Sequence, residues 1–201
     1  MFLSRMALDL TRPDTQLLLH SKEAAKEMVQ SLFPKDCTSF LWTHEHLDGR
    51  LWLILSSTLR PDYGPLHEKI GFLGVFPSWD IMDYSDFLEQ LEENTVYHFR
   101  LHVYPFDSLQ TMDNSLIHIS RIREWFLETG KESGFLPLTF STILSHWESI
   151  NYTYVVSSSL EGTLKIINMD HFQKALIHGF GYHKDYGSGL MTISTYKSIW
   201  H

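Results

Sequence analysis

Apolar residues recur along the chain with two different spacings, and the spacing predicts which segments are helices and which are strands. Residues 22–33 carry an apolar stripe at helical spacing that stops at Pro34, so they are predicted to form a helix. Residues 95–105 alternate between apolar and polar positions, which is typical of a strand with one buried face. Both types of element are therefore expected in one chain.

The first half is predicted to contain strand, helix, strand, strand, helix and strand, in that order: residues 2–10, 22–33, 39–45, 50–57, 85–93 and 95–105. The two middle strands form a hairpin that turns at Leu47-Asp48-Gly49. A less regular stretch, residues 59–83, carries three prolines. The order β-α-β-β-α-β defines a ferredoxin-like unit.

The same order is predicted a second time without any repeat in the sequence itself: a strand at 115–119, a helix starting at Ser120, strands at 136–144 and 152–167, a helix from Asn168 to Gly179, and a strand at 189–195. The expected fold class is α+β, with two tandem ferredoxin-like (RRM-like, βαββαβ) domains packed together. We expect them to span residues 1–108 and 109–201, joined by a polar connector at 106–114.

Composition narrows the class of protein further. The chain has 201 residues, and 24 acidic residues against 16 basic ones give a net charge of −8, which argues against a generic nucleic-acid binder. Cys37 is the single cysteine, so no internal disulfide can form and a cytoplasmic protein is expected. The start of the chain lacks a signal-peptide pattern, and the longest purely apolar run, residues 51–55, is too short to span a membrane.

The segment from Gly179 to Leu190 holds the glycines that stand out most: Gly179, Gly181, Gly187 and Gly189. It leaves a predicted helix and enters a predicted strand, which is the reverse of a dinucleotide-binding fingerprint. Glycines at this density indicate unusual backbone conformations or close approach to another chain segment. Two interpretations stay open, a structural loop and a contact with phosphate or RNA.

The twelve histidines raise the question of a metal site or an acid–base site. No Cys or His spacing matches a zinc template, so no metal is expected. No Ser-His-Asp or Cys-His pattern indicates a nucleophile either. His20 precedes the first predicted helix, where an acid–base residue can work, but a lone histidine is more often a surface residue.

Several segments taken together resemble the CasE family, the repeat-RNA endonuclease subunit of type I-E CRISPR Cascade. They fall in family order and spacing: FLSRMALDL, SLFP, FLWTHE, RPD at 60–62, HFRL at 98–101, SLEGTLKIIN and GFGYHKDYGSGLMTI. The resemblance implies tandem ferredoxin-like domains and a ribonuclease that needs no metal or other cofactor. Such an enzyme directs a ribose 2′-OH at the scissile phosphate with the help of a general base. The implied partners are the crRNA repeat hairpin and the Cascade backbone subunits.

The chain departs from the family where chemistry is expected. The family histidine lies eight residues before the proline that ends the first helix, and that position here is Lys26. A tyrosine used by some members falls at Glu23. Lysine, with a pKa of about 10.4, is a poor proton shuttle at neutral pH. Basic residues are also sparse, and the RNA-binding candidates that remain are Lys184, Arg100, Arg121 and Arg123, together with the four loop glycines.

Three functional hypotheses follow. The first is a divergent CasE-like endoribonuclease that uses His20 or Lys26 as its catalytic residue. The second is a CasE-like protein with impaired cleavage, either a weak holder of the hairpin or an inhibitor-type (anti-CRISPR) mimic that docks on Cascade. The third is an unrelated double ferredoxin-like protein. The missing histidine and the charge of −8 favour the second. The free protein is expected to be a monomer.

Overall fold

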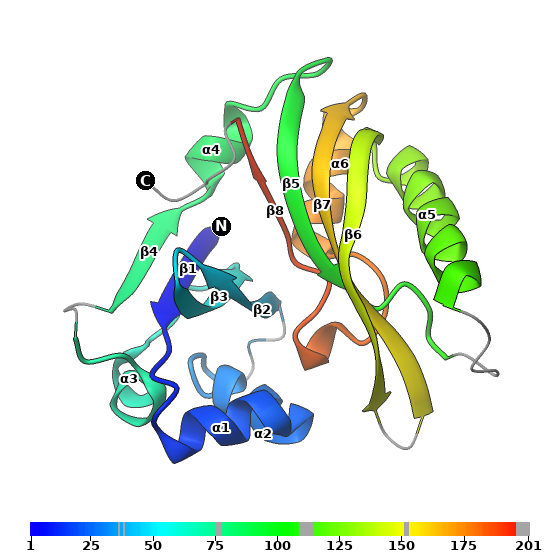
Figure 1. Cartoon of the computed structure of the whole chain (residues 1–201). Coiled ribbons are helices and arrows are strands. Elements are labelled where there is room, and N and C mark those ends of the chain that lie inside the picture. Colours follow the sequence, from blue (N-terminus) through cyan, green and yellow to red (C-terminus); the bar gives the residue numbers. More distant parts are fainter. Residues whose placement is uncertain (36, 38, 75–77, 109–114, 151–152, 196–201) are drawn as a thin grey trace. The chain divides into compact units, whose positions relative to one another are not determined.

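The computed structural model describes residues 1–195 except 36, 38, 75–77, 109–114 and 151–152. The chain divides into two units, residues 1–89 with 185–187, and residues 90–184 with the residues from 188 onward (Figure 1). Within the described ranges, none of the helices combines the length and the apolar character needed to cross a membrane.

The first unit is built on a four-stranded antiparallel sheet in the order β2-β3-β1-β4. Its elements, in chain order, are β1 (Phe2–Ala7), α1 (Pro13–His20), α2 (Lys22–Gln30), β2 (Phe40–Leu47), β3 (Arg50–Ser57), α3 (Gly64–Ile70), β4 (Trp79–Asp83) and α4 (Ser85–Glu89). Strands β2 and β3 form the predicted hairpin, with Leu47 paired to Arg50 across the turn.

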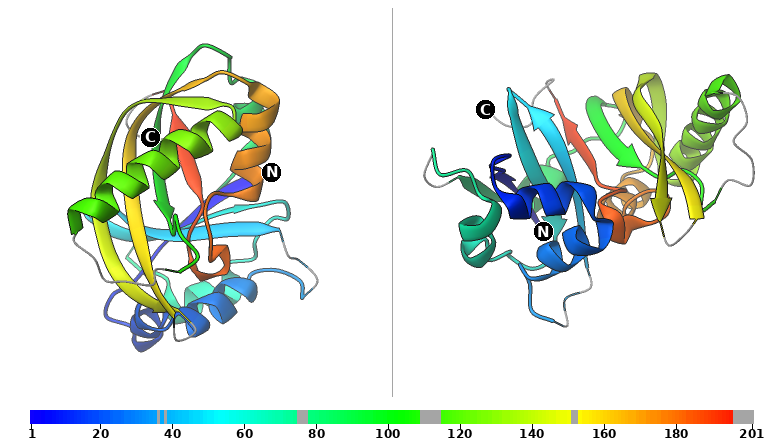
Figure 2. Two further views of the ribbon diagram at one scale, coloured as in Figure 1. Left: turned by 90° about the vertical axis from the view of Figure 1, so that its right-hand side faces the viewer. Right: turned by 60° about the horizontal axis from the view of Figure 1, so that its bottom comes forward.

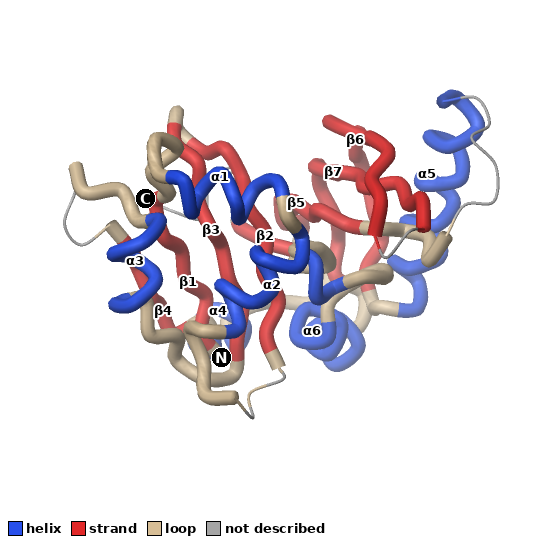
Figure 3. Tube along the Cα trace, turned by 90° about the horizontal axis from the view of Figure 1, so that it is seen from below, coloured by secondary structure: helices blue, strands red, loops and turns tan. Residues whose placement is uncertain are grey.

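Helices α1, α2 and α3 lie against strands β1 to β3, as the view from below shows (Figure 3). One apolar cluster joins them, because each helix contributes buried residues that meet those of the strands; its helix members are Leu18, Ala25, Val29, Leu66 and Ile70, and its strand members include Met6, Trp42, Leu51, Leu53 and Leu55. This burial holds α2 in place on the sheet, and α2 carries Lys26.

The second unit repeats the topology, with strand order β6-β7-β5-β8. Its elements are β5 (Val96–Val103), α5 (Ser115–Glu132), β6 (Phe135–Ile150), β7 (Thr153–Ile166), α6 (Met169–His178), the 3₁₀ turn η1 at Lys184–Tyr186, whose last two residues belong to the first unit, and β8 (Met191–Ser194). The order β5-α5-β6-β7-α6-β8 is a complete βαββαβ unit.

Both helices of the second unit pack on one face of its sheet (Figure 2). Phe126 of α5 lies 5.1 Å from Phe99 of β5 and 5.5 Å from Phe135 of β6, measured between ring centroids. Phe172 of α6 lies 5.7 Å from Phe135. These aromatic rings form the centre of the second core.

Several predictions are confirmed. The fold class is α+β with two ferredoxin-like units, as predicted. The alternation in residues 95–105 corresponds to β5, in which the residues Tyr97, Phe99, Leu101 and Val103 are buried. Asn168 caps α6 by accepting a hydrogen bond from the backbone N–H of His171, and Gly179 ends that helix with a φ of 74°.

Other predictions are wrong. Strand β5 pairs with β7 and β8, so it opens the second sheet instead of closing the first, and the units divide after residue 89 and not at 108. The strand that closes the first sheet is β4, inside the stretch that looked irregular. Residues 115–119 lie in α5, not in a strand. Residues 109–114 of the expected connector lie outside the described residues.

Candidate functional site

Helix α2 presents Lys26 on its half-exposed side. Ser21 caps the start of the helix, because its Oγ accepts a hydrogen bond from the backbone N–H of Ala24 at 3.2 Å. Ala25 and Val29 face the core, which leaves the side chain of Lys26 44% exposed. Lys26 therefore reaches the surface from a helix that is fixed by its buried face.

Lys26 is already paired in this structure. Its Nζ lies 2.7 Å from Oδ2 of Asp185, and the ammonium stands 5.5 Å from the ring centroid of Tyr186. The hydrogen bond and charge of Asp185 raise the pKa of Lys26 above its ordinary value, against a smaller opposing effect of burial. Lys26 therefore stays protonated at neutral pH. In that state it can donate hydrogen bonds but cannot accept a proton.

The segment that pairs with Lys26, residues 185–187, belongs to the first unit. Trp42 of that unit contacts its backbone at two points. The indole Nε1–H of Trp42 donates a hydrogen bond to the backbone carbonyl of Asp185 at 3.3 Å. Gly187 has a φ of 83° and lies against the Trp42 ring, where a Cβ would come within 2.8 Å. This glycine is required both by its conformation and by the space available.

A pocket of about 600 Å³ opens beside Lys26. Its lining comes from α2, from the segment that follows α2 and from Tyr186; the lining residues are Glu23, Lys26, Glu27, Gln30, Ser31, Phe33, Lys35 and Tyr186. Two aromatic rings and two ammonium groups thus face one hollow, next to two carboxylates. The arrangement places both signs of charge beside aromatic surface.

His20 does not belong to this pocket. It is the last residue of α1, a helix that the periodicity did not predict, and its Nδ1 lies 2.7 Å from the backbone carbonyl oxygen of Gln16. Because a carbonyl oxygen only accepts hydrogen bonds, Nδ1 is the donor in this one. His20 is exposed and is not among the residues that line the pocket.

The other loop glycines have structural reasons of their own. Gly181 and Gly189 have φ values of 69° and 83°, and a Cβ on either would come within 2.6 Å of a backbone oxygen. Gly179 is the C-cap of α6. The fold itself therefore accounts for these glycines as parts of a structural loop.

Lys184 also has a structural partner. Its Nζ donates a hydrogen bond to the backbone carbonyl of His178, the last residue of α6, at 2.9 Å. A cation at this end complements the helix dipole. Burial lowers the pKa of Lys184 below its ordinary value.

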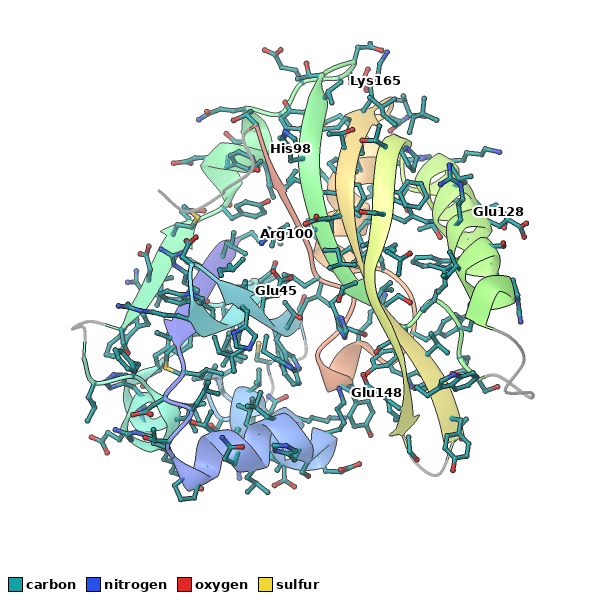
Figure 4. The ribbon with its side chains drawn as sticks, viewed as in Figure 1. Glu45, His98, Arg100, Glu128, Glu148 and Lys165 are labelled. Carbon is teal, nitrogen blue, oxygen red and sulfur yellow. The ribbon has the colours of Figure 1, made fainter. Side chains whose placement is uncertain are left out.

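The three arginine candidates lie on two elements of the second unit, and each has its own partner. Arg100 projects from β5, the strand that also carries His98 (Figure 4), and its Nε lies 3.5 Å from a carboxylate oxygen of Glu161. On α5, Arg121 stands over the ring of Phe106 at 4.8 Å, and Arg123 stands over that of Phe140 at 5.0 Å.

Sequence reasoning missed three residues of interest. Asp185 and Tyr186 lie in the glycine-rich segment, but nothing in their spacing indicates a partner on α2. His183 has a φ of 51°, rare for a residue with a side chain, and its Nε2 lies 2.8 Å from the backbone oxygen of Asp107 and 3.4 Å from its Oδ1. Among the described residues, no group of His, Cys, Asp and Glu side chains is arranged to hold a metal ion.

Comparison with known proteins identifies the family. The family model described as CRISPR associated protein matches residues 1–195. The chain belongs to this family. The membership that its motifs indicated is thereby confirmed. Among curated protein sequences, none matches the chain significantly.

Solved structures of CRISPR-associated proteins share the fold over nearly the whole length. A CRISPR-associated protein from Thermus thermophilus matches with a TM-score of 0.77 at 18% identity, covering 96% of this chain and 100% of that one. Thermus thermophilus Cse3 bound to an RNA representing a pre-cleavage complex matches with a TM-score of 0.78 at 17% identity, covering 96% and 98%. Cas6e from Escherichia coli str. K-12 gives 0.63 at 15% identity, covering 98% and 100%.

In this CRISPR-associated protein, the position at which the resemblance implies a catalytic histidine carries a lysine held by a carboxylate. A general base must be able to accept a proton, so a lysine in that role needs a lowered pKa, whereas the pKa of Lys26 is raised. Lys26 can therefore offer positive charge to a phosphate, but it does not supply a base at neutral pH.

Proposed function

We propose that this chain binds the repeat hairpin of CRISPR RNA in a type I-E system and cleaves it slowly or not at all. Family membership and the tandem ferredoxin-like fold support RNA binding, because the solved structures with this fold include an endoribonuclease, Cse3, bound to a 19-nucleotide RNA. The ion pair between Lys26 and Asp185 carries the proposal of impaired cleavage.

Attack of a ribose 2′-OH on the adjacent phosphate needs a group that removes the hydroxyl proton. Lys26 cannot do so while it is protonated, and His20 is exposed at the end of α1, outside the lining of the pocket. The pocket keeps the ammonium groups of Lys26 and Lys35, which can hold a phosphate, beside the carboxylates of Glu23 and Glu27, which oppose its charge.

The residues that we propose to contact RNA are few. Lys184, Arg100, Arg121 and Arg123 supply cations, and the loop glycines allow a close approach of backbone N–H groups to phosphate; these glycines are Gly179, Gly181, Gly187 and Gly189. Each cation already has a partner in the free protein. Together with the charge of −8, this favours weak binding with a shallow dependence on salt, because few phosphates are neutralised.

The test uses the purified full chain and a labelled repeat hairpin from a type I-E array. Fluorescence anisotropy measures binding across a salt series, and denaturing gels measure cleavage with and without EDTA. We expect weak binding at low salt and slow or undetectable cleavage that EDTA does not change. Rapid cleavage would overturn the proposed impairment, and no binding to any repeat hairpin at low salt would overturn RNA binding itself.

A second candidate function is docking on Cascade in place of an authentic CasE subunit, with the hairpin excluded. The net charge of −8 favours it, since an acidic protein holds RNA poorly but can keep a surface for protein partners. Co-expression with Cascade subunits, once without CasE and once with the full set, tests it. Co-purification in place of CasE would support docking, whereas tight hairpin binding with no co-purification would exclude it.

A further inference from the structure

The pair formed by Lys26 and Asp185 joins residues 159 positions apart, at a place open to solvent. The side chain of Lys26 is 44% exposed and that of Asp185 is 69% exposed. Ion pairs this exposed contribute little to stability, because water and salt screen them. An incoming anion can therefore replace the carboxylate at the ammonium group without disrupting the fold.

The backbone of Asp185 is fixed independently of its carboxylate. The hydrogen bond from Trp42 holds the carbonyl of Asp185, and the packing of Gly187 on the same indole ring holds the segment two residues later. The carboxylate can consequently rotate away from Lys26 while the segment keeps its place. A substitution confined to the Asp185 carboxylate should likewise leave the segment in position.

Lys26 remains oriented when the carboxylate leaves. Its ammonium lies over the face of Tyr186, a favourable position for a cation, and both residues line the pocket of about 600 Å³. Lys35 lines the same pocket. An RNA phosphate that enters the pocket thus meets one cation already positioned on an aromatic ring.

We propose that Asp185 is an internal competitor for RNA phosphate at Lys26 and thereby sets the affinity of the protein for its RNA. The proposal rests on the RNA-binding function proposed above and names the residue that weakens it. In the free protein the carboxylate occupies the hydrogen-bonding position on Nζ that a phosphate oxygen takes in the complex. Binding exchanges one anion for another, so Lys26 adds little net affinity.

The exchange has a measurable signature in salt. When a free lysine neutralises a phosphate, roughly 0.7 to 0.9 counterions are released. When the lysine must first leave a carboxylate, the carboxylate takes up a cation in turn and the net release is smaller. Removing the carboxylate should therefore steepen the dependence of log K on log salt by up to roughly 0.7.

The experiment measures hairpin binding by anisotropy over a salt series for four full-length proteins: the natural chain, Asp185→Asn, Glu27→Gln, and the double variant Lys26→Gln with Asp185→Asn. Glu27 lines the same pocket, so Glu27→Gln removes an equal charge nearby and leaves the ion pair intact. Circular dichroism and thermal melting establish that each variant is folded.

We expect Asp185→Asn to bind about two- to fivefold more tightly at low salt and with a steeper salt slope. Glu27→Gln should give a smaller gain and an unchanged slope, and the double variant should lose the steeper slope. Equal effects of Asp185→Asn and Glu27→Gln would overturn the proposal, as would weaker binding by a folded Asp185→Asn. If the natural chain and every variant fail to bind, the proposed RNA-binding function fails and this inference falls with it.

Discussion

Gly187 lies directly against the indole ring of Trp42, so closely that a Cβ built on the glycine would stand 2.8 Å from Cζ3 of the ring. The same ring donates its N–H to the carbonyl of Asp185. Trp42, a buried residue of β2, thus positions Asp185 and Gly187 and with them the segment that lies next to Lys26.

Gly187→Ala is expected to destabilise the protein for two reasons, its positive φ and the contact with Trp42. Gly49→Ala is the matched control, because Gly49 has a φ of 75° but no atom within 4 Å of the added Cβ. We expect Gly187→Ala to cost about 1–3 kcal/mol more than Gly49→Ala in urea denaturation. Equal costs would show that the contact with Trp42 contributes nothing.

Tyr104→Phe is expected to change the stability of the protein at alkaline pH. Tyr104 is fully buried and donates a hydrogen bond to Oε2 of Glu148 at 2.6 Å. Burial, and to a lesser extent Glu148, raise the pKa of this hydroxyl in the folded state. Above about pH 10 the unfolded tyrosine loses its proton while the folded one keeps it, so the free energy of unfolding falls as pH rises.

Urea denaturation between pH 8 and about pH 11 measures this slope. Tyr104→Phe should make the fall above pH 10 shallower. It should not abolish the fall, since burial also raises the pKa of Tyr63. Tyr182→Phe, at a tyrosine that is 49% exposed, serves as the control and should leave the slope unchanged. An unchanged slope in Tyr104→Phe would contradict the assignment.

Phe126→Ala is expected to destabilise the second unit strongly. Phe126 is completely buried, with the rings of Phe99, Phe135 and Phe140 at 4.9 to 5.5 Å. Truncation leaves a cavity between helix and sheet and should cost about 3–5 kcal/mol. Leu138→Ala, at a side chain 46% exposed, should cost less than about 1 kcal/mol in the same thermal or urea assay.

Lys26→His is expected to raise the cleavage of a repeat hairpin. A histidine titrates near neutral pH and can accept the proton that the lysine cannot. A positioned general base accelerates such a step by roughly 10²- to 10⁴-fold, which single-turnover assays on denaturing gels resolve. Lys26→Ala should leave the low natural rate unchanged. Rapid cleavage by the natural chain that is lost in His20→Ala would instead assign the chemistry to His20.

The strand pairing of the first half shows why periodicity predicts elements better than it predicts partners. The alternation of β5 correctly predicted a strand with one buried face, but the strand pairs with β7 and β8, far along the chain. Strand β4 was overlooked because it is a five-residue edge strand with two aspartates. Helix α3 was overlooked because it has only seven residues and starts with Gly64 and Pro65.

The sequence by itself determined the fold class, the hairpin, the caps of α6, the glycine-rich loop and the family, because these depend on local spacing and local backbone conformation. Only the tertiary structure decided where the units divide and that Asp185 holds Lys26. Nothing near either residue in the chain indicates the other, because their contact depends on how the core holds α2 and on how Trp42 anchors the loop.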